Sequence, residues 1–140
     1  MKMKRILFFL ILLGCTNRDY RINKAREFMQ SWNYERALVE LNPFKDKRDA
    51  MAHYLIGQCY LGKNNYEEAR NYFKEAIQFD TIYIDSVDPV YKSLIQKSMK
   101  IEDTERAAFF FDQLLSLSPR PFFEPSFLFL MGDIYYNSKN

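Results

Sequence analysis

The sequence predicts an all-α chain in which antiparallel helix pairs follow one another. Apolar residues recur at spacings of three and four through most of the chain, which is the period of an amphipathic helix. Residues 33–37, 65–69 and 103–107 align without gaps, at successive offsets of 32 and 38 residues. Alternation of apolar and polar residues, typical of a half-buried strand, is limited to the short Thr81–Asp85. A helical repeat is therefore the expected architecture.

The composition is that of a small folded protein. The 140 residues have room for one domain or a short repeat array, and 48% of them are hydrophobic while 27% are charged. These values exclude a disordered tail and a multi-span membrane protein. The formal charge of +2 includes Lys2, Lys4 and Arg5; without residues 1–14, 17 basic residues face 18 acidic ones, a net charge of −1. Nucleic acid is therefore not an expected partner.

The first element is an apolar segment with a positive start. Met1–Arg5 carries three basic residues, and Ile6–Leu13 is an apolar run of eight. A membrane-spanning helix needs about 20 apolar residues, whereas the apolar core of a secretory signal peptide has about 7–15. We therefore expect residues 1–14 to be a cleaved signal peptide. A buried core helix and an uncleaved anchor are the other interpretations.

The end of this segment, Leu12-Leu13-Gly14-Cys15, resembles the lipobox of bacterial lipoproteins. The resemblance implies that Cys15 becomes the first mature residue and carries acyl chains, two or more of which anchor a protein stably. Residues 15–17 would then form a very short tether. In the Gram-negative sorting pattern, Asp after the cysteine favours the inner membrane. Thr16 stands there instead, which implies an outer-membrane lipoprotein that faces the periplasm if the source is Gram-negative.

The remaining elements are expected to be helices at 18–31, 34–42, 50–61, 66–79, 88–100, 104–117 and 125–137. Asn33, Asn65 and Asp103 are good N-caps because their side chains accept a hydrogen bond from a free amide of the first turn. A glutamate two residues after each cap favours the positive end of the helix dipole. The helical stripe is strongest in two helices, through Tyr66, Ala69, Phe73, Ala76 and Ile77, and through Ala107, Phe110, Phe111, Leu114 and Leu115.

These helix pairs of about 34 residues resemble the tetratricopeptide repeat. The best-matching unit, counted from Ala50, has fitting residues at Gly57, Tyr60, Ala69, Phe73 and Ala76. The unit counted from Asp88 fits at Leu94, Ala107, Phe111 and Pro119 but departs from the pattern at Ile95 and Ser98. The resemblance implies an α-α superhelix over residues 18–140. We expect about three and a half repeats in it, at 18–49, 50–83, 88–121 and 125–140.

In that family the first helix of each pair lines a concave groove. Carried over to this sequence, the candidate groove residues are Arg26, Tyr54, Gln58, Leu61, Lys92, Gln96, Phe129, Asp133 and Tyr136. Their mixture of aromatic, amide and singly charged side chains suits an extended peptide or a helix of a partner protein. One subgroup clamps a terminal carboxylate with Lys and Asn, but Tyr54 and Gln58 occupy the corresponding places here. Packing or solvation is the alternative role for each candidate.

Basic residues follow the predicted lipid anchor closely. Arg18, Arg21 and Lys24 lie three to nine residues after Cys15, so we expect this helix close to the bilayer. A basic residue near an anionic surface contributes on the order of 1 kcal/mol. A solvated helix face is the other interpretation, because Asp19 and Glu27 lie among these residues.

The last predicted helix is apolar almost all round, from Phe127 to Tyr136. Such a helix is normally buried on most sides, whereas terminal units of solenoids need a polar outer face. Three explanations are open. The chain is a fragment of a longer repeat protein, it self-associates through this helix, or it receives a partner helix here.

Catalytic and metal chemistry find little support in the sequence. His53 is the only histidine, and Cys59 reads as a small buried apolar residue. The four glycines are too far apart for a phosphate-binding loop. We therefore expect no enzyme, cofactor or metal site. The sequence predicts a membrane-anchored envelope lipoprotein that acts as a scaffold or assembly factor for another protein. The alternatives are an amino-terminal fragment of a larger lipoprotein that binds its ligand beyond residue 140, and a self-assembling structural component.

Overall fold

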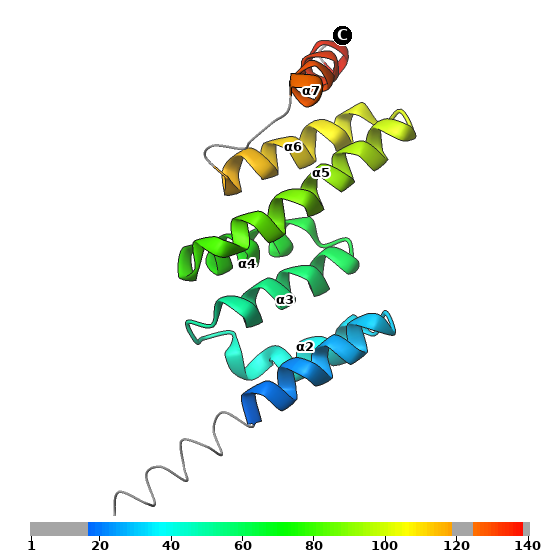
Figure 1. Cartoon of the computed structure of the whole chain (residues 1–140). Coiled ribbons are helices and arrows are strands. Elements are labelled where there is room, and N and C mark those ends of the chain that lie inside the picture. The colour runs from blue at the N-terminus through cyan, green and yellow to red at the C-terminus, as the bar shows by residue number, and fades with distance from the viewer. Residues whose placement is uncertain (1–16, 119–124, 139–140) are drawn as a thin grey trace, which may run out of the picture. The chain divides into compact units, whose positions relative to one another are not determined.

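The computed structural model describes residues 17–118 and 125–138 (Figure 1). Seven α-helices and two short 3-10 helices, but no strand, lie within these residues. The predicted all-α class of paired helices is therefore confirmed. The predicted signal peptide, Cys15 and most of the tether lie outside the described residues.

The chain forms two compact units, Met1–Phe79 and Asp80–Asn140. The described helices of the first unit are residues 17–30 (here the first helix), α2 (Tyr34–Leu41), η1 (Asn42–Phe44), α3 (Ala50–Gly62) and α4 (Tyr66–Phe79). Those of the second unit are η2 (Thr81–Tyr83), α5 (Ile84–Lys100), α6 (Thr104–Leu117) and α7 (Pro125–Ser138). Within each unit, consecutive α-helices from α2 onward pack on one another.

One turn geometry recurs three times. The residue before each predicted N-cap has a left-handed backbone with φ 59°, at Trp32, Asn64 and Glu102. The amide of the following residue donates to a carbonyl five residues back, as in Asn33 N to Phe28 O (2.8 Å), Asn65 N to Tyr60 O (2.9 Å) and Asp103 N to Ser98 O (2.9 Å). These bonds terminate one helix in a Schellman motif while the cap begins the next. The Asn33 and Asp103 side chains accept from the amides of Arg36 and Arg106, as predicted.

The core of the first unit joins its helices. Its buried members, from the first helix to α3, are Ile22, Ala25, Ala37, Leu41, Phe44, Ala52, Leu55, Ile56 and Cys59. On α4, Ala69, Phe73 and Ala76 are also buried. A Cβ on Gly57 would lie 2.7 Å from the Phe73 ring and 3.2 Å from the Ala69 carbonyl oxygen. Only glycine therefore permits this close approach of α3 and α4 without displacing the ring.

The start of α5 differs from the prediction. The helix begins at Ile84, not at residue 88, and η2 leads into it, so the alternating Thr81–Asp85 is not a strand. The buried stripe of α5 runs from Val87 through Tyr91 to Ile95, so it begins upstream of residue 88. Burial of this stripe favours a helical conformation for the residues before Pro89. The helix forms there although proline has no amide proton to donate to the carbonyl four residues back.

The last helix, α7, packs on α6 with only part of its surface. Met131 and Ile134 are buried, and the Tyr135 ring meets the Phe111 ring edge to face at 5.7 Å. Leu128, Phe129 and Tyr136 remain exposed. The helix therefore has one buried stripe and one open apolar stripe.

Candidate protein-binding surface

The candidate groove residues of the first unit centre on α3. Tyr54, Gln58 and Leu61 are half-buried and share one face of that helix. The Gln58 side-chain amide donates to the Tyr54 hydroxyl at 2.8 Å, and the Tyr54 ring lies 5.7 Å from the Phe73 ring of α4. Packing against α4 therefore fixes the ring of Tyr54, while the polar ends of Tyr54 and Gln58 form a joined pair.

Arg26 extends this surface to the neighbouring helix. Its Nη2 lies 3.3 Å from the Met51 sulfur of α3, and its side chain is otherwise exposed. The structure thus links the first helix and α3 along the predicted groove face, and it places Arg26 near the amino-terminal end of α3. An exposed guanidinium on such a face is suited to carboxylates and backbone carbonyls of a bound segment.

Two candidate residues of the second unit, Lys92 and Gln96, lie one turn apart on α5. Lys92 Nζ is 2.7 Å from Asp88 Oδ2, so its charge is already paired within the helix. Gln96 is exposed. Among the described residues, the buried Asp88 Oδ1 has no hydrogen-bond partner.

Three candidate residues, Phe129, Asp133 and Tyr136, share the open stripe of α7. Phe129 is 79% exposed and Tyr136 is 73% exposed. Gly132 lies between them, and a Cβ there would meet nothing within 4 Å. This stripe offers aromatic contact area beside a single carboxylate, a combination that suits a protein contact.

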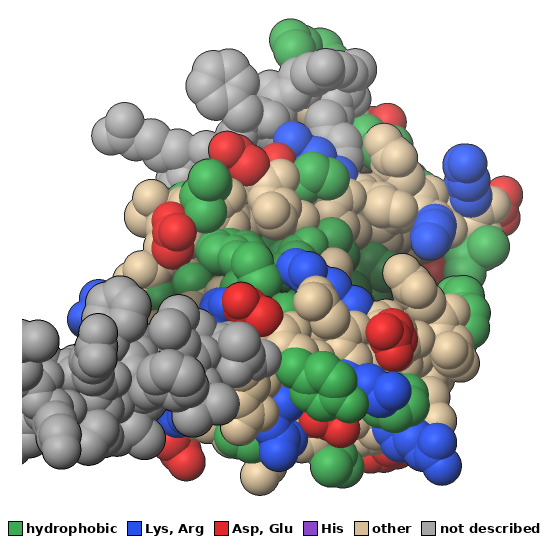
Figure 2. Space-filling model, turned by 60° about the horizontal axis from the view of Figure 1, so that its bottom comes forward, with side chains coloured by type: hydrophobic (Ala, Val, Ile, Leu, Met, Phe, Trp, Pro, Cys, Tyr) green, Lys and Arg blue, Asp and Glu red, His purple; other side chains and the backbone are tan. Residues whose placement is uncertain are grey.

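The three basic residues expected to face the membrane each contact a carboxylate of the first unit. Arg18 Nε lies 2.6 Å from Asp49 Oδ2 and its Nη2 lies 2.9 Å from Oδ1, which makes a bidentate pair. Arg21 pairs with Glu40 at 3.2 Å, and Lys24 pairs with Glu27 at 3.6 Å. Figure 2, which brings the lower end of the Figure 1 view forward, shows basic and acidic side chains interspersed on the surface in that view. These pairs reduce the positive charge that the three residues present to a surface.

The histidine and the second cysteine occupy buried positions. His53 Nδ1 lies 2.9 Å from the Asp49 carbonyl oxygen, and its Nε2 lies 3.3 Å from Glu75 Oε2 of α4. Burial raises the pKa of the Cys59 thiol to about 12, so it stays protonated and unreactive at neutral pH. Among the described residues, no group of His, Cys, Asp and Glu has the arrangement of a metal site.

The family comparison bears on the helix pair that carries Tyr54 and Gln58. Residues 50–81 match the family model of the tetratricopeptide repeat. This segment is a tetratricopeptide repeat. No curated protein matches the chain. The repeat indicates a scaffold for protein–protein interaction, and repeats of this family generally have no catalytic role. Within the part of the chain that the structure describes, no helix is long and apolar enough to cross a bilayer.

One surface feature has no counterpart in the sequence prediction. A hollow lies beside the repeat, between α2 and the carboxyl-terminal end of α3, and Lys45 and Asn42 line it. These residues come from a connection and a helix end that carry no motif. The sequence offered no signal for them, because the hollow exists only once α2 and α3 have packed.

Proposed function

We propose that the chain is a lipoprotein of the bacterial cell envelope, anchored through acyl chains on Cys15, whose repeats bind a segment of another protein. The observation that carries the binding half is the tetratricopeptide repeat at residues 50–81, with Tyr54 and Gln58 joined on one face of α3. Fixed aromatic rings with a polar end give large contact area at a small cost in side-chain entropy.

The anchoring half is supported by the order of features at the amino terminus. Three basic residues, eight apolar residues and Leu12-Leu13-Gly14-Cys15 follow one another in the arrangement of a lipoprotein signal. If the source is Gram-negative, Thr16 after the cysteine favours the outer membrane, with the repeats on the periplasmic side. Residues 17–30 are helical, and Arg18 lies only three positions after Cys15, so an acylated Cys15 would hold the first helix near the bilayer.

Substitution of Cys15 tests the anchor. We expect the wild-type chain to fractionate with membranes and to yield a diacylated or triacylated amino-terminal peptide in mass spectrometry. Cys15→Ser should lose both the acyl mass and the processing at residue 15. Cys59→Ala is the matched control, because it removes the other cysteine and should leave the acylated peptide unchanged. Acyl chains on Cys15→Ser, or none on the wild type, would contradict the proposal.

Substitution of the α3 pair tests the groove. The double variant Tyr54→Ala with Gln58→Ala should lose the protein that cross-links to the wild-type chain in envelope membranes. Lys74→Ala is a control on the exposed face of α4 and should keep it. Far-ultraviolet circular dichroism of each variant checks that the helices persist. Unchanged cross-linking of the double variant would place the binding surface elsewhere.

Contact of Arg18, Arg21 and Lys24 with anionic headgroups is a further part of the proposal. Because each has a carboxylate partner, we expect less than the roughly 1 kcal/mol that a free basic residue contributes at such a surface. Replacing the three with glutamate should weaken binding of the unacylated Cys15→Ser chain to vesicles that contain phosphatidylglycerol. Unchanged binding would remove this contact.

Self-association through α7 is a second candidate function. The exposure of Phe129 and Tyr136 favours it, since exposed aromatic pairs on one helix face are common at protein contacts. Sedimentation of the Cys15→Ser chain should then show concentration-dependent oligomers, and Phe129→Ser with Tyr136→Ser should reduce them. A monomer at all concentrations would exclude self-association.

A further inference from the structure

We propose that the hollow between α2 and α3 is a second binding site, which takes an acidic side chain of a partner protein together with a neighbouring aliphatic side chain. The site goes beyond the groove function, because it uses Tyr60 and Lys63, which lie off the α3 face of Tyr54 and Gln58, together with the α2–η1 segment. The argument rests on the shape of the hollow, its apolar walls and its uncompensated charge.

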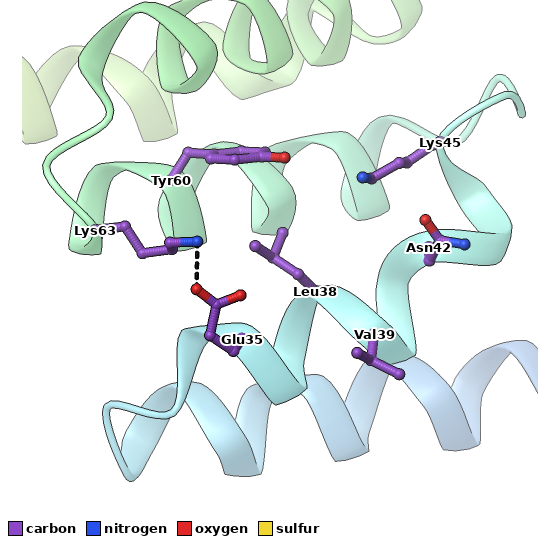
Figure 3. A pocket seen from close by; sticks show the side chains of 7 residues that line it. All are labelled: Glu35, Leu38, Val39, Asn42, Lys45, Tyr60 and Lys63. Carbon is purple, nitrogen blue, oxygen red and sulfur yellow. Dashed lines mark ion pairs between the residues drawn. The ribbon is translucent and has the colours of Figure 1, made fainter.

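The hollow has a volume of about 350 Å³. Figure 3 shows Tyr60 along one side and Leu38 facing it across the space, with Lys45 and Lys63 pointing inward from opposite ends. Ligand pockets of whole cofactors and drugs occupy about 300–1,000 Å³, so this volume lies near the lower limit. It fits part of a peptide better than a complete cofactor.

Two walls of the hollow, Tyr60 and Leu38, are apolar and pack against the core of the first unit. The Tyr60 ring stacks on the Tyr72 ring of α4, with centroids 5.5 Å apart and planes 10° from parallel. Leu38 is half-buried opposite, and Val39 next to it is 68% exposed. A partner's aliphatic side chain placed between Tyr60 and Leu38 would bury apolar surface on both sides. The fixed ring reduces the ordering cost of binding.

The charge of the hollow is positive. Lys63 Nζ lies 2.5 Å from Glu35 Oε1, so these two charges compensate each other. Lys45 is half-buried. Among the described residues, no carboxylate oxygen lies within 4.0 Å of the Lys45 ammonium, which is the limit for an ion pair. One ammonium therefore remains available in the hollow. The side chain of Asn42, at the end of α2, adds a hydrogen-bonding group beside it.

These features together select the occupant. An isolated inorganic anion or a phospholipid headgroup would engage Lys45 but would leave the Tyr60 and Leu38 walls unused. A purely apolar segment would leave the Lys45 charge uncompensated in a half-buried place. A carboxylate with an aliphatic neighbour suits both the charge and the apolar walls. The carboxylate accepts a charge-assisted hydrogen bond from Lys45, and the aliphatic side chain covers Tyr60 and Leu38. The occupant is therefore an acidic–aliphatic segment of a protein.

Titration with a matched pair of small peptides tests the site. The probes are N-acetyl-leucyl-aspartate amide and N-acetyl-leucyl-asparagine amide, added at millimolar concentration to the ¹⁵N-labelled full chain in a non-ionic maltoside detergent. We expect the aspartate probe to shift the amide resonances of residues 35–45 and 60–63. The asparagine probe should bind about tenfold more weakly, since it lacks the charge that Lys45 compensates.

Variants of Lys45 separate this site from the groove. Lys45→Gln should lower the affinity for the aspartate probe about tenfold, and Lys45→Arg should retain most of that affinity. Lys47→Gln is the matched control, because Lys47 is exposed and lies over the Phe44 ring outside the hollow. Tyr54→Ala with Gln58→Ala should also keep the shifts, whatever its effect on the groove partner. Equal binding of both probes, or binding unchanged by Lys45→Gln, would overturn the proposal.

Discussion

Single residues set how closely the helices of each unit approach. Gly57 lies where the ring of Phe73 and the backbone of Ala69 leave no room for a Cβ. Gly132 has the opposite surroundings, with open space around the position of a Cβ. The two positions therefore separate the packing role of glycine from its effect on helix propensity.

We predict that Gly57→Ala destabilises the protein. Overpacking of a buried site typically costs about 1–3 kcal/mol, which exceeds the gain of up to about 1 kcal/mol from the better helix former. Gly132→Ala, free of any clash, should instead raise the stability by roughly 0.5–1 kcal/mol. Urea unfolding followed by circular dichroism measures both. A stabilised Gly57→Ala would show that Phe73 moves aside without cost.

The Arg18–Asp49 pair makes stability depend on pH. Burial acts to raise the pKa of Asp49, but the hydrogen bonds from Arg18 and the Ala52 amide outweigh it and hold the pKa below its ordinary value. A carboxyl whose folded pKa is depressed contributes stability above its unfolded pKa. It loses that contribution as the pH falls through the folded pKa.

We therefore predict that Arg18→Met costs about 0.5–1 kcal/mol at pH 7, a modest value because Arg18 is partly exposed. The difference between variant and wild type should shrink as the pH falls from the ordinary carboxyl pKa of about 4 through the lowered pKa of the folded Asp49. Urea unfolding at pH 7 and pH 3 measures it. The control is Arg36→Met, whose guanidinium lies over the Phe28 ring, and its effect should not change with pH. A pH-independent cost of Arg18→Met would refute the pairing.

At the scale of the elements, N-caps and apolar stripes predict most helix ends correctly, but they do not predict the start of α5. Two helices begin and end where the sequence predicts, at 66–79 and 104–117, because a capping residue and an apolar stripe agree within each. In α5 the two rules conflict. Pro89 favours a start near residue 88, whereas the buried stripe continues to Val87, and burial decides.

Replacing the proline tests this conflict. Pro89 is exposed, so Pro89→Ala removes no packing, and it adds an amide that is able to donate within the helix. We predict a gain on the order of 1–3 kcal/mol and slower hydrogen exchange across residues 84–92. The outcome that contradicts this account is an unchanged exchange rate in the first two turns of α5.

At the scale of the whole molecule, the chain contains two compact units, and each has buried apolar residues of its own. Buried residues of the first unit include Ala52, Ile56 and Phe73, and those of the second include Tyr91, Phe110 and others of α5 and α6. In repeat proteins, stability is approximately a sum of unit and neighbour contributions. Local changes should therefore have local effects.

We predict that Gly57→Ala speeds hydrogen exchange in residues 50–79 more than in residues 84–117. The overpacked contact lies wholly in the first unit, so sub-global opening there should become easier first. Hydrogen exchange with mass spectrometry of the full chain measures both segments. Pro89→Ala is the reciprocal control, since its effect should be largest in the second unit. Equal acceleration in both units would show that they unfold as one.

The sequence by itself determined the helices and the repeated turns, because helix period and N-caps are set within a few neighbouring residues. It also predicted the close helix packing at Gly57, and it offered Tyr54 and Gln58 as groove candidates, which lie hydrogen-bonded on one face of α3. Only the tertiary structure decided that Arg18 is bound by Asp49, 31 residues away, and that Lys45 lies in a hollow with Tyr60. These arrangements depend on which helix faces meet, and that choice is made by packing between segments distant in sequence.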